Sequence, residues 1–546
     1  MQDTDNRSAS VFPSIFNDVI GPVMRGPSSS HSAAALRIGK MARALMNGSI
    51  TNVMVAFDHS GSLPYTHTTH GSDMGLAGGF LGFEMDDNRL PQYENELQKR
   101  GIVIQYQTGE FGDQHPNTYR ITLESSVETH SMVALSTGGG MIEVIEIDGA
   151  EVSLQGDLFT TIVYANGDAQ PILEKLASMH GTVSLKKGRQ GFFAEIVSHQ
   201  ALLDTDIEVI LALAGVKYVR SLPPVLPIHR PRQLELPFSN LQEMAALARD
   251  KHLNLDALAL LYESRRGNIS ETTVLQRMIE IVRVLRSSIA TGLAGTEYEN
   301  RILGYQSGDY LESLKNNRLM DLGVMNRVIP YVASLMEVKS SLGVIVAAPT
   351  AGSCGCLPGA VLGTADTLEK DDEAAARAML AAGMIGVFIT RMSTFAAEVG
   401  GCQVECGAGS AMAAGALTTL LAGTTDMALS ATSMALQNSL GMICDPVANR
   451  VEVPCLGKNT MAAANAVTCA NMALAGFDTV IPLEEVIQTM DRVGKSMPHE
   501  LRCTALGGLS ITPAAKAVET ERIDKGRKAE DGKGQRTENR SQRPEN

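Results

Sequence analysis

The stretch GAGSAMAAGALTTLLAGTT, residues 407–425, contains no charged side chain. It is long enough to be taken for a membrane span, but Ala, Gly, Ser and Thr are too weakly apolar to be driven into lipid, and Asp426 follows at once. Small side chains let neighbouring helices approach closely. We therefore predict a buried helix in a compact helical core.

The sequence on either side of this stretch has the same character. The chain is rich in Ala, Met and Leu from residue 241 to 518, with apolar residues at helical spacing over 274–289 and 427–440. This pattern predicts an all-α C-terminal domain over 241–518. A proline-rich stretch over 229–240 is predicted to be a linker, and the charged tail over 519–546 is predicted to be disordered.

The N-terminal half is different, because short strand signals alternate with turns. Residues 12–155 predict an α+β domain built around one or two helices. Over 158–228 the order of signals is strand, helix, strand, strand, helix, strand, which predicts a ferredoxin-like βαββαβ module. The same order is found in ACT domains, which are small amino-acid-sensing modules. We therefore expect a multidomain protein with an ACT-type module between an α+β domain and an all-α domain.

Composition narrows the possible partners and the compartment. The 546 residues carry a formal charge of −14, which argues against nucleic acid or an anionic membrane surface as a partner. The N-terminus is polar and has no apolar signal core, so we expect a cytoplasmic protein. Eight cysteines without the spacing of a disulfide framework suit a reducing compartment.

Three cysteines in the C-terminal part of the chain each lie in a stretch punctuated by Gly or Pro. Cys402, Cys444 and Cys455 are separated by 42 and 11 residues, without the close Cys-x-x-Cys pairs of zinc knuckles and ferredoxins. Turn sequences can aim side chains at one point, so these residues are candidate thiolate ligands of an iron-sulfur cluster. The pattern alone leaves open that they are buried thiols, as we expect of Cys469 and Cys503. The rival ligands are Cys354, Cys356 and Cys406.

Several further motifs give the chain a family resemblance. Over residues 12–515 it resembles the iron-sulfur-dependent L-serine dehydratases, or L-serine ammonia-lyases, as a single chain that fuses their β-type and α-type parts. The motifs that carry the resemblance are GPSSSHS at 26–32, GSL at 61–63, HGSD at 70–73, GGG at 138–140, APTAGSCG at 348–355, EVGGCQVE at 398–405, CDPVA at 444–448 and VPC at 453–455.

The resemblance implies an activity and a cofactor. Cys402, Cys444 and Cys455 would hold a 4Fe-4S cluster whose remaining iron acts as a Lewis acid on the β-hydroxyl of L-serine, giving pyruvate and ammonia. Some members carry a further cysteine after a Gly-Gly-Leu segment that caps the cluster. Here no cysteine follows residues 507–509, so we expect an open fourth position.

The candidate residues for acid-base chemistry and substrate binding come from the same motifs. His31 and His70 are the candidate catalytic residues, because histidine titrates in the working range. His67 and His115 are interpreted as loop or turn residues. The candidate substrate-binding residues, which offer hydroxyl groups or free backbone amides to a carboxylate, are Ser28, Ser29, Ser30, Thr350, Gly352 and Ser353.

Other functions remain open from the sequence. A related iron-sulfur lyase acting on cysteine, threonine or another hydroxylated amino acid would carry similar motifs. An amino-acid sensor without catalysis would need no thiolate site. Chemistry based on pyridoxal phosphate would need a Schiff-base lysine, for which Lys458 is the nearest candidate. We expect a small amino-acid substrate, no nucleic-acid or membrane partner, and a homodimer.

Overall fold

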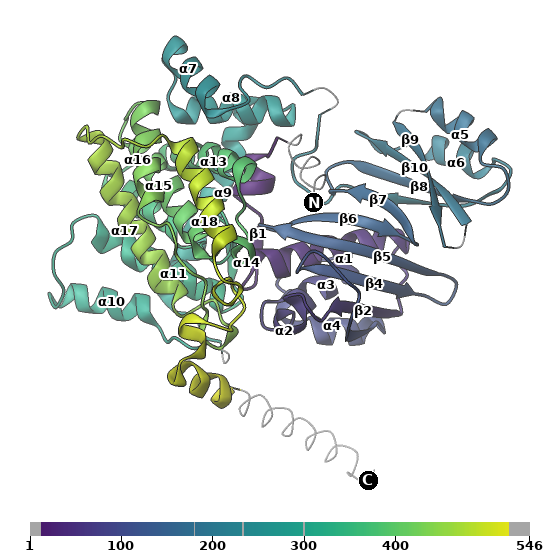
Figure 1. The fold of residues 1–546 in the computed structure, drawn as a ribbon, viewed down its shortest axis with the longest axis horizontal. Helices are drawn as coiled ribbons and strands as arrows, with labels where there is room; N and C mark the ends of the chain where they lie inside the picture. The colour runs from purple at the N-terminus through teal and green to yellow at the C-terminus, as the bar shows by residue number, and fades with distance from the viewer. Residues whose placement is uncertain (1–11, 180, 190, 232–233, 299–300, 523–546) are drawn as a thin grey trace, which may run out of the picture.

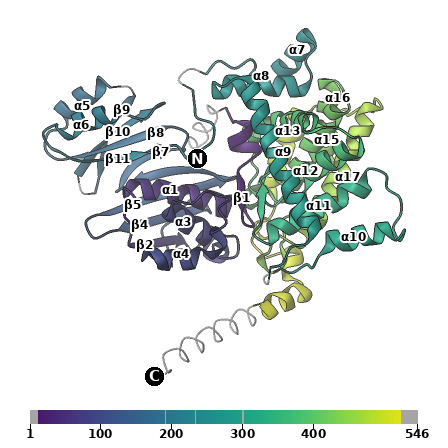
Figure 2. The same cartoon turned by 180° about the vertical axis from the view of Figure 1, so that it is seen from behind.

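The computed structural model describes residues 12–179, 181–189, 191–231, 234–298 and 301–522. Figure 1 shows a helical lobe, coloured teal to yellow, beside a lobe rich in strands, coloured purple to blue. The view from behind in Figure 2 shows the same separation, with the early purple segment reaching from one lobe into the other. The expected mixed N-terminal region and helical C-terminal region are both present.

The first part of the strand-rich lobe is a six-stranded sheet. Its order is β3-β2-β4-β5-β6-β7; β2 and β3 run parallel and all other neighbours run antiparallel. Burial alternates along strands such as β7, as expected for a sheet with one face packed on a core. The elements are α1 (Ala34–Leu45), β2 (Asn52–Asp58), α2 (Leu63–Thr66), α3 (Ser72–Leu81), α4 (Tyr93–Arg100), β3 (Val103–Gly109), β4 (Thr118–Glu124), β5 (Thr129–Gly138), β6 (Met141–Ile147) and β7 (Ala150–Leu154).

The two main helices of this lobe, α1 and α3, cross unusually closely because glycines face each other at the contact. A Cβ added to Gly79 would lie 2.4 Å from the carbonyl oxygen of Leu36 and 2.6 Å from the Cα of Gly39. A Cβ added to Gly75 would lie 2.2 Å from the carbonyl oxygen of Ser32. Because the neighbouring atoms are backbone, they cannot move aside easily, and only glycine fits.

The second part of the strand-rich lobe is a four-stranded antiparallel sheet of order β11-β8-β10-β9. Its elements follow the predicted order strand, helix, strand, strand, helix, strand. One face packs on the two helices, and the other packs against the N-terminal sheet. The first helix, expected over 170–180, ends at Ala177, and His180 lies outside the described residues. The elements are β8 (Phe159–Ala165), α5 (Gln170–Ala177), β9 (Thr182–Gly188), β10 (Gly191–Ser198), α6 (Asp204–Leu211) and β11 (Val216–Leu222).

The helical lobe is built around a buried central helix. The helix predicted over 407–425 is present as α15, which is packed between α12, α13, α16 and α17. Within the described ranges one helix, α13, is long and apolar enough to cross a membrane, but 78% of its most apolar window is buried inside the protein. The helices are α7 (Leu241–Lys251), α8 (Leu255–Gly267), α9 (Glu271–Ala294), α10 (Gln306–Lys315), α11 (Met325–Ser340), α12 (Cys356–Thr367), α13 (Asp372–Met392), α14 (Ala397–Gly400), α15 (Cys406–Leu420), α16 (Thr425–Gln437), α17 (Cys455–Leu474) and α18 (Leu483–Ser496).

The C-terminal region is not purely helical, which corrects the all-α prediction. A three-residue strand, β12 (Val344–Val346), pairs antiparallel with β1 (Val23–Arg25) from the N-terminal part of the chain. Both views place β1 at the boundary between the lobes (Figures 1 and 2). A strand this short has no detectable period in the sequence, since its pairing partner lies more than three hundred positions away.

The N-terminal segment before β1 packs into the helical lobe. Residues 15–20 bury apolar side chains among the helices of that lobe. The buried Glu263 carboxylate accepts hydrogen bonds from Ser14 Oγ at 2.5 Å and from the Ile15 amide at 2.8 Å. Asn17 exchanges two hydrogen bonds with the backbone of Ile228. The two lobes are therefore joined both by this segment and by the chain between β11 and α7.

The close contact of α1 and α3 gives a test of the packing. We expect Gly79→Ala to destabilise the protein by about 1 to 3 kcal/mol, because the added methyl must push backbone atoms apart. The control is Gly457→Ala in α17, where a Cβ meets nothing within 4 Å. That change should be neutral or stabilising by about 0.5 to 1 kcal/mol. Urea unfolding midpoints measure both effects, and equal midpoints for the two variants would show that the contact is not tight.

Candidate active site

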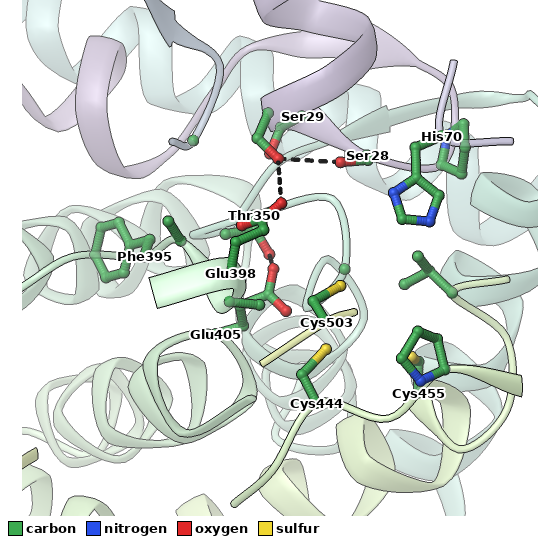
Figure 3. A pocket seen from close by; sticks show the side chains of 18 residues that line it. Ser28, Ser29, His70, Thr350, Phe395, Glu398, Glu405, Cys444, Cys455 and Cys503 are labelled. Carbon is green, nitrogen blue, oxygen red and sulfur yellow. Dashed lines mark hydrogen bonds between the residues drawn. The ribbon is translucent and has the colours of Figure 1, made fainter. Parts of the chain in front are cut away.

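A pocket lies where the two lobes meet, and both lobes contribute to its wall. Figure 3 shows Cys444, Cys455 and Cys503 on one side of this pocket and His70 with Ser28 and Ser29 on another. The lining residues are Pro27, Ser28, Ser29, Ser30, His70 and Gly139 from the strand-rich lobe, and Thr350, Gly352, Phe395, Ala396, Ala397, Glu398, Glu405, Cys444, Pro446, Val451, Cys455 and Cys503 from the helical lobe.

Of the three predicted ligand cysteines, Cys444 and Cys455 line this pocket, and Cys402 lies beside Cys444 just outside its wall. Cys402, Cys444 and Cys455 are only 2%, 4% and 5% exposed. The donor atoms of Cys402, Glu405 and Cys444 all lie within 4.8 Å of one another. Cys455, the first residue of α17, lines the same pocket. Residues 42 and 11 positions apart in sequence thus come close in space. The rivals Cys354 and Cys356 are buried outside the pocket wall, and the rival Cys406 hydrogen-bonds to Cys402.

The backbone around these cysteines explains how they are aimed. Gly401 has φ +74°, and a Cβ there would lie 2.9 Å from the carbonyl oxygen of Met442, so the turn before Cys402 requires glycine. Gln403 then joins the segment of Cys402 to that of Cys444. Its backbone amide donates to Met442 O at 3.0 Å, and its side-chain Oε1 accepts from the backbone amide of Gly441 at 2.9 Å. The loop that carries Cys444 is therefore held directly against the turn that carries Cys402.

Cys503 lies in the pocket wall, which the sequence analysis did not predict. Its backbone amide donates to Cys444 O at 3.0 Å, and the Cys444 amide donates to Leu501 O at 2.9 Å. This short parallel bridge brings the Cys503 thiol beside that of Cys444. The pocket therefore has a cysteine that precedes the Gly-Gly-Leu segment, although none follows it.

The electrostatics of the pocket favour a thiolate at Cys402, whereas the hydrogen bond to Cys402 raises the pKa of Cys444 and burial raises that of Cys455. Hydrogen bonds from the Cys406 and Cys444 thiols lower the pKa of Cys402 well below that of a free thiol, against the opposing effect of burial. Lys458 donates to Asp445 Oδ1 and to Ile443 O, both at 2.7 Å. Burial lowers the pKa of Lys458, but the Cys402 thiolate and Asp445 outweigh it, so this lysine stays a cation. Its ammonium is held by these partners and is not a free amine for a Schiff base.

These donors fit a metal cofactor. Thiolate sulfur is a soft ligand that selects iron-sulfur clusters, zinc or copper over magnesium and calcium. Several thiols converge within one buried site, and cations nearby offset their charge. The site is thus compatible with a soft transition metal.

His70 and His31 lie next to each other, with ring centroids 4.7 Å apart. They lie close to the loop of residues 28–30, which we call the serine loop. His70 lines the pocket, and its Nε2 donates to Asn449 O at 3.0 Å, because a carbonyl oxygen can only accept. The proton is therefore on Nε2, and Nδ1 keeps its lone pair. Burial, as the largest cause, lowers the pKa of His70 to about 4. At neutral pH this side chain is an uncharged imidazole.

His31 differs, because both of its ring nitrogens are engaged. The Thr66 hydroxyl donates to Ser62 O at 2.8 Å, so its oxygen accepts from His31 Nε2 at 2.9 Å. His31 Nδ1 is then the acceptor for the Ser28 hydroxyl at 3.0 Å. Burial, with a smaller contribution from His70, lowers the pKa of His31 well below its usual value. His31 lies outside the pocket wall and orients Ser28.

The predicted substrate-binding residues fall into two groups. Ser28, Ser29, Ser30, Thr350 and Gly352 line the pocket, whereas Ser353 is fully buried behind it. The two loops that carry these residues are joined by the Ala351 backbone amide, which donates to Ser29 Oγ at 3.3 Å. Thr350 Oγ1 donates to Glu405 Oε1 at 2.8 Å, which joins its loop to the segment of Cys402.

Two carboxyl groups of the pocket were not among the predicted site residues. Glu398 accepts from Ser30 Oγ at 3.4 Å and from the Asn117 side chain, and burial raises its pKa. Burial and the Cys402 thiolate raise the pKa of Glu405 well above its usual value. Glu398 and Glu405 are the first and last residues of the EVGGCQVE motif that supports the family resemblance. That motif is the sequence signal from which the two carboxyl groups could have been predicted.

The fold and the site define a two-lobed protein with a thiol-lined pocket between the lobes. Residues 239–510 match the family model described as the serine dehydratase alpha chain. The probable L-serine dehydratase alpha chain of Bacillus subtilis is 31% identical over 282 residues, which cover 52% of this chain and 94% of that protein. The probable beta chain of the same organism is 32% identical over 197 residues, covering 36% of this chain and 88% of that protein.

A single-chain relative aligns along most of the sequence. The L-serine dehydratase TdcG of Escherichia coli is 25% identical over 511 residues, covering 89% of this chain and 96% of that protein. The chain belongs to the L-serine dehydratase family, and the resemblance given by its motifs is confirmed.

Proposed function

We propose that this protein is an L-serine ammonia-lyase, which converts L-serine to pyruvate and ammonia at a 4Fe-4S cluster held by Cys402, Cys444 and Cys455. One observation carries the proposal: Cys444 and Cys455, with Cys402 beside Cys444, lie at a pocket whose opposite wall holds a neutral histidine and a serine loop. When bound, such a cluster supplies a Lewis acid for the departing β-hydroxyl. Cys503 is close enough to Cys444 to shield the site.

His70 is the proposed general base. Its Nδ1 has a free lone pair and its ring lines the pocket, so it can accept the Cα proton of a substrate bound beside the cysteines. Loss of this proton and of the β-hydroxyl as water gives aminoacrylate. This enamine tautomerises to an imine, and water then releases pyruvate and ammonia.

The two charged groups of the substrate have separate partners in this proposal. Ser28, Ser29 and Ser30 offer hydroxyls to the carboxylate, and His31 orients the first of them. Thr350, Gly352 and Ser353 form the facing loop, in which Ser353 supports Thr350 through a contact of 3.1 Å between their hydroxyls.

Glu398 is the proposed partner of the substrate ammonium. The other pocket-lining carboxyl, Glu405, already accepts from Thr350 and lies among the thiols. Asp445 is paired with Lys458. Among the described residues Glu398 accepts hydrogen bonds from neutral groups, Ser30 and Asn117, and it gains a full charge-assisted bond when an ammonium enters.

The division of the chain into domains is proposed on the basis of the same family. We assign residues 12–155 to the β-type α+β domain, 158–228 to the ACT-type module and 241–518 to the catalytic domain. Residues 229–240 form the linker in this division. A cytoplasmic homodimer that acts on a small amino acid completes the proposal, with no nucleic-acid or membrane partner.

Cluster loading and turnover test the function. Protein purified without oxygen and loaded with iron and sulfide should form pyruvate from L-serine, and iron-free protein should not. Cys444→Ala should lose both the visible absorbance of the cluster and pyruvate formation, because a ligand is removed. The control, Cys469→Ala, changes a thiol outside the pocket and should keep both. Pyruvate formation without iron contradicts the proposal, and turnover of threonine or cysteine alone moves it to a related lyase.

The role of His70 has its own test. His70→Gln should lower kcat by about 100-fold or more, because the base is lost, with little change in KM. His67→Gln is the matched control, since His67 pairs with Asp73 at 2.6 Å and does not line the pocket. A base must be uncharged, and the pKa of His70 is about 4, so its activity is lost only as the pH falls through that value. A wild-type kcat for the Gln variant would exclude His70 as the base.

The role of Glu398 predicts a change in binding rather than in chemistry. Glu398→Gln removes the charge that holds the ammonium, so KM for L-serine should rise by about 10-fold or more. Inhibition by glycerate, which carries a hydroxyl in place of the ammonium, should be unchanged. Glu373→Gln, on the exposed surface of α13, should leave both constants as they are. A loss of glycerate and serine binding together would mean that Glu398 merely supports the fold of the pocket.

A further inference from the structure

A lysine, Lys339, is buried behind the cysteines of the active-site pocket. It lies in the last turn of α11, which packs against α17, the helix that begins at Cys455 (Figures 1 and 2). Its side chain is fully buried, with 0% exposed. In the described part of the chain no carboxylate lies within ion-pair distance of its ammonium, whereas Lys458 is paired with Asp445 at 2.7 Å.

The ammonium of Lys339 holds the loop that joins two of the candidate ligands. Its Nζ donates to the carbonyl oxygen of Val451, a residue that lines the pocket and lies between Cys444 and Cys455 in the chain. Among the described residues this carbonyl is its single acceptor, although an ammonium has three N–H donors. One neutral carbonyl oxygen does not compensate a buried positive charge. The charge at this position therefore needs an anionic partner.

The charge of Lys339 reaches the metal-binding side of the pocket. Val338, the residue before it, packs in one apolar cluster with Cys354 and Cys455. Burial raises the pKa of Cys455 and of Glu405, and the charge of Lys339 opposes the effect of burial at both. The lysine is therefore close enough to stabilise negative charge on the sulfur of Cys455.

We propose that Lys339 is the buried counter-ion of the loaded cysteine site, a positioning residue that stabilises the negative charge of the cluster and its thiolates. This inference rests on the proposed function, because its anion comes from the cluster. A coordinated thiol is deprotonated, and three thiolates carry more negative charge than an oxidised 4Fe-4S core carries positive charge. Lys339 matches the remainder, since the charge of Lys458 is already matched by Asp445.

A purely structural role makes a different prediction for the iron-free protein. A cation in the last turn of a helix interacts favourably with the helix dipole, and Lys339 also satisfies the carbonyl of Val451. If only these contacts mattered, removing the lysine would destabilise the protein with or without iron. As a counter-ion, Lys339 lacks its anion in the iron-free protein, and removing it there relieves the cost of burying the charge. The sign of the effect separates the two roles.

Stability is measured first, on the full-length iron-free protein. Lys339→Met keeps an unbranched side chain and removes the charge. Its urea midpoint should equal or exceed that of wild type, because relief of a buried charge outweighs the loss of one hydrogen bond. Lys315→Met is the matched control, since Lys315 is exposed in the last turn of α10 and its change should leave the midpoint unaltered. A midpoint for Lys339→Met below that of the control overturns the inference.

The cluster is measured second, in protein loaded with iron and sulfide without oxygen. Its reduction potential depends on the surrounding charge, because reduction adds an electron. Lys339→Met should lower the potential by the equivalent of 10-fold in the reduction equilibrium, about 59 mV for one electron. Lys339→Arg, which keeps the charge, and Lys315→Met should stay close to wild type. A redox titration followed by electron paramagnetic resonance measures this, and an unchanged potential in Lys339→Met overturns the counter-ion role.

Retention of the cluster gives a second readout where a variant loads poorly. Loss of the cluster from folded Lys339→Met but not from Lys339→Arg supports the role of the charge. Loss from both variants would show that the shape of the lysine matters instead, and would overturn the inference.

Failure of the proposed function is seen in wild type, which would then form no cluster or no pyruvate. The stability comparison contains no iron and is unaffected by that outcome. A wild type that loads a cluster and converts L-serine, with Lys339→Met of the same potential, removes the counter-ion role and leaves the proposed function in place.

Discussion

The junction between the lobes is the constraint on which the site depends. The pairing of β1 with β12 is only three residues long, yet the serine loop and the Thr350 loop both leave from it. Backbone bonds extend the junction, since the Gly21 amide donates to Ala347 O at 2.9 Å and the Ala347 amide to Pro22 O at 3.1 Å. So short a ladder does not hold two lobes together by itself. The apolar side chains of residues 15–20, buried in the helical core just before it, add hydrophobic stabilisation.

The buried charged group next to this junction is stabilised by hydrogen-bond donors. Glu263 is fully buried and has a raised pKa because of desolvation, and it remains tolerable because Ser14 and the Ile15 amide donate to it. At the pocket itself the thiols, Glu398 and Glu405 place several acidic groups close together. The cations Lys339 and Lys458 reduce the repulsion, and a bound metal would reduce it further. A bound cation would therefore relieve the crowding of these acidic groups.

Much of the fold could be predicted from the sequence, because it depends on local sequence patterns. The buried helix predicted over 407–425, which the structure has as α15 over 406–420, and the strand and helix order over 158–228 depend on composition and period, which are properties of short windows. The β1–β12 pair could not be found in this way, since only distant partners define it. The motifs brought out Cys402, Cys444 and Cys455 as candidates. Cys503 and Glu398 were missed for a similar reason: Cys503 reaches the pocket through a backbone bridge to Cys444, and Glu398 through a cleft that exists only after the lobes meet.

The cleft also explains why one continuous chain suits this site. In Bacillus subtilis the probable alpha and beta chains are separate proteins, and each aligns with part of this chain. Here His70 and the serine loop come from the first part and the cysteines from the second, so neither part holds a complete pocket. Joining the parts makes their association intramolecular, at an effective concentration of about millimolar or higher for a short connection. The strength needed at the lobe interface falls accordingly, which is consistent with a junction built from a three-residue strand pair, one inserted segment and a few hydrogen bonds such as that of His70 to Asn449.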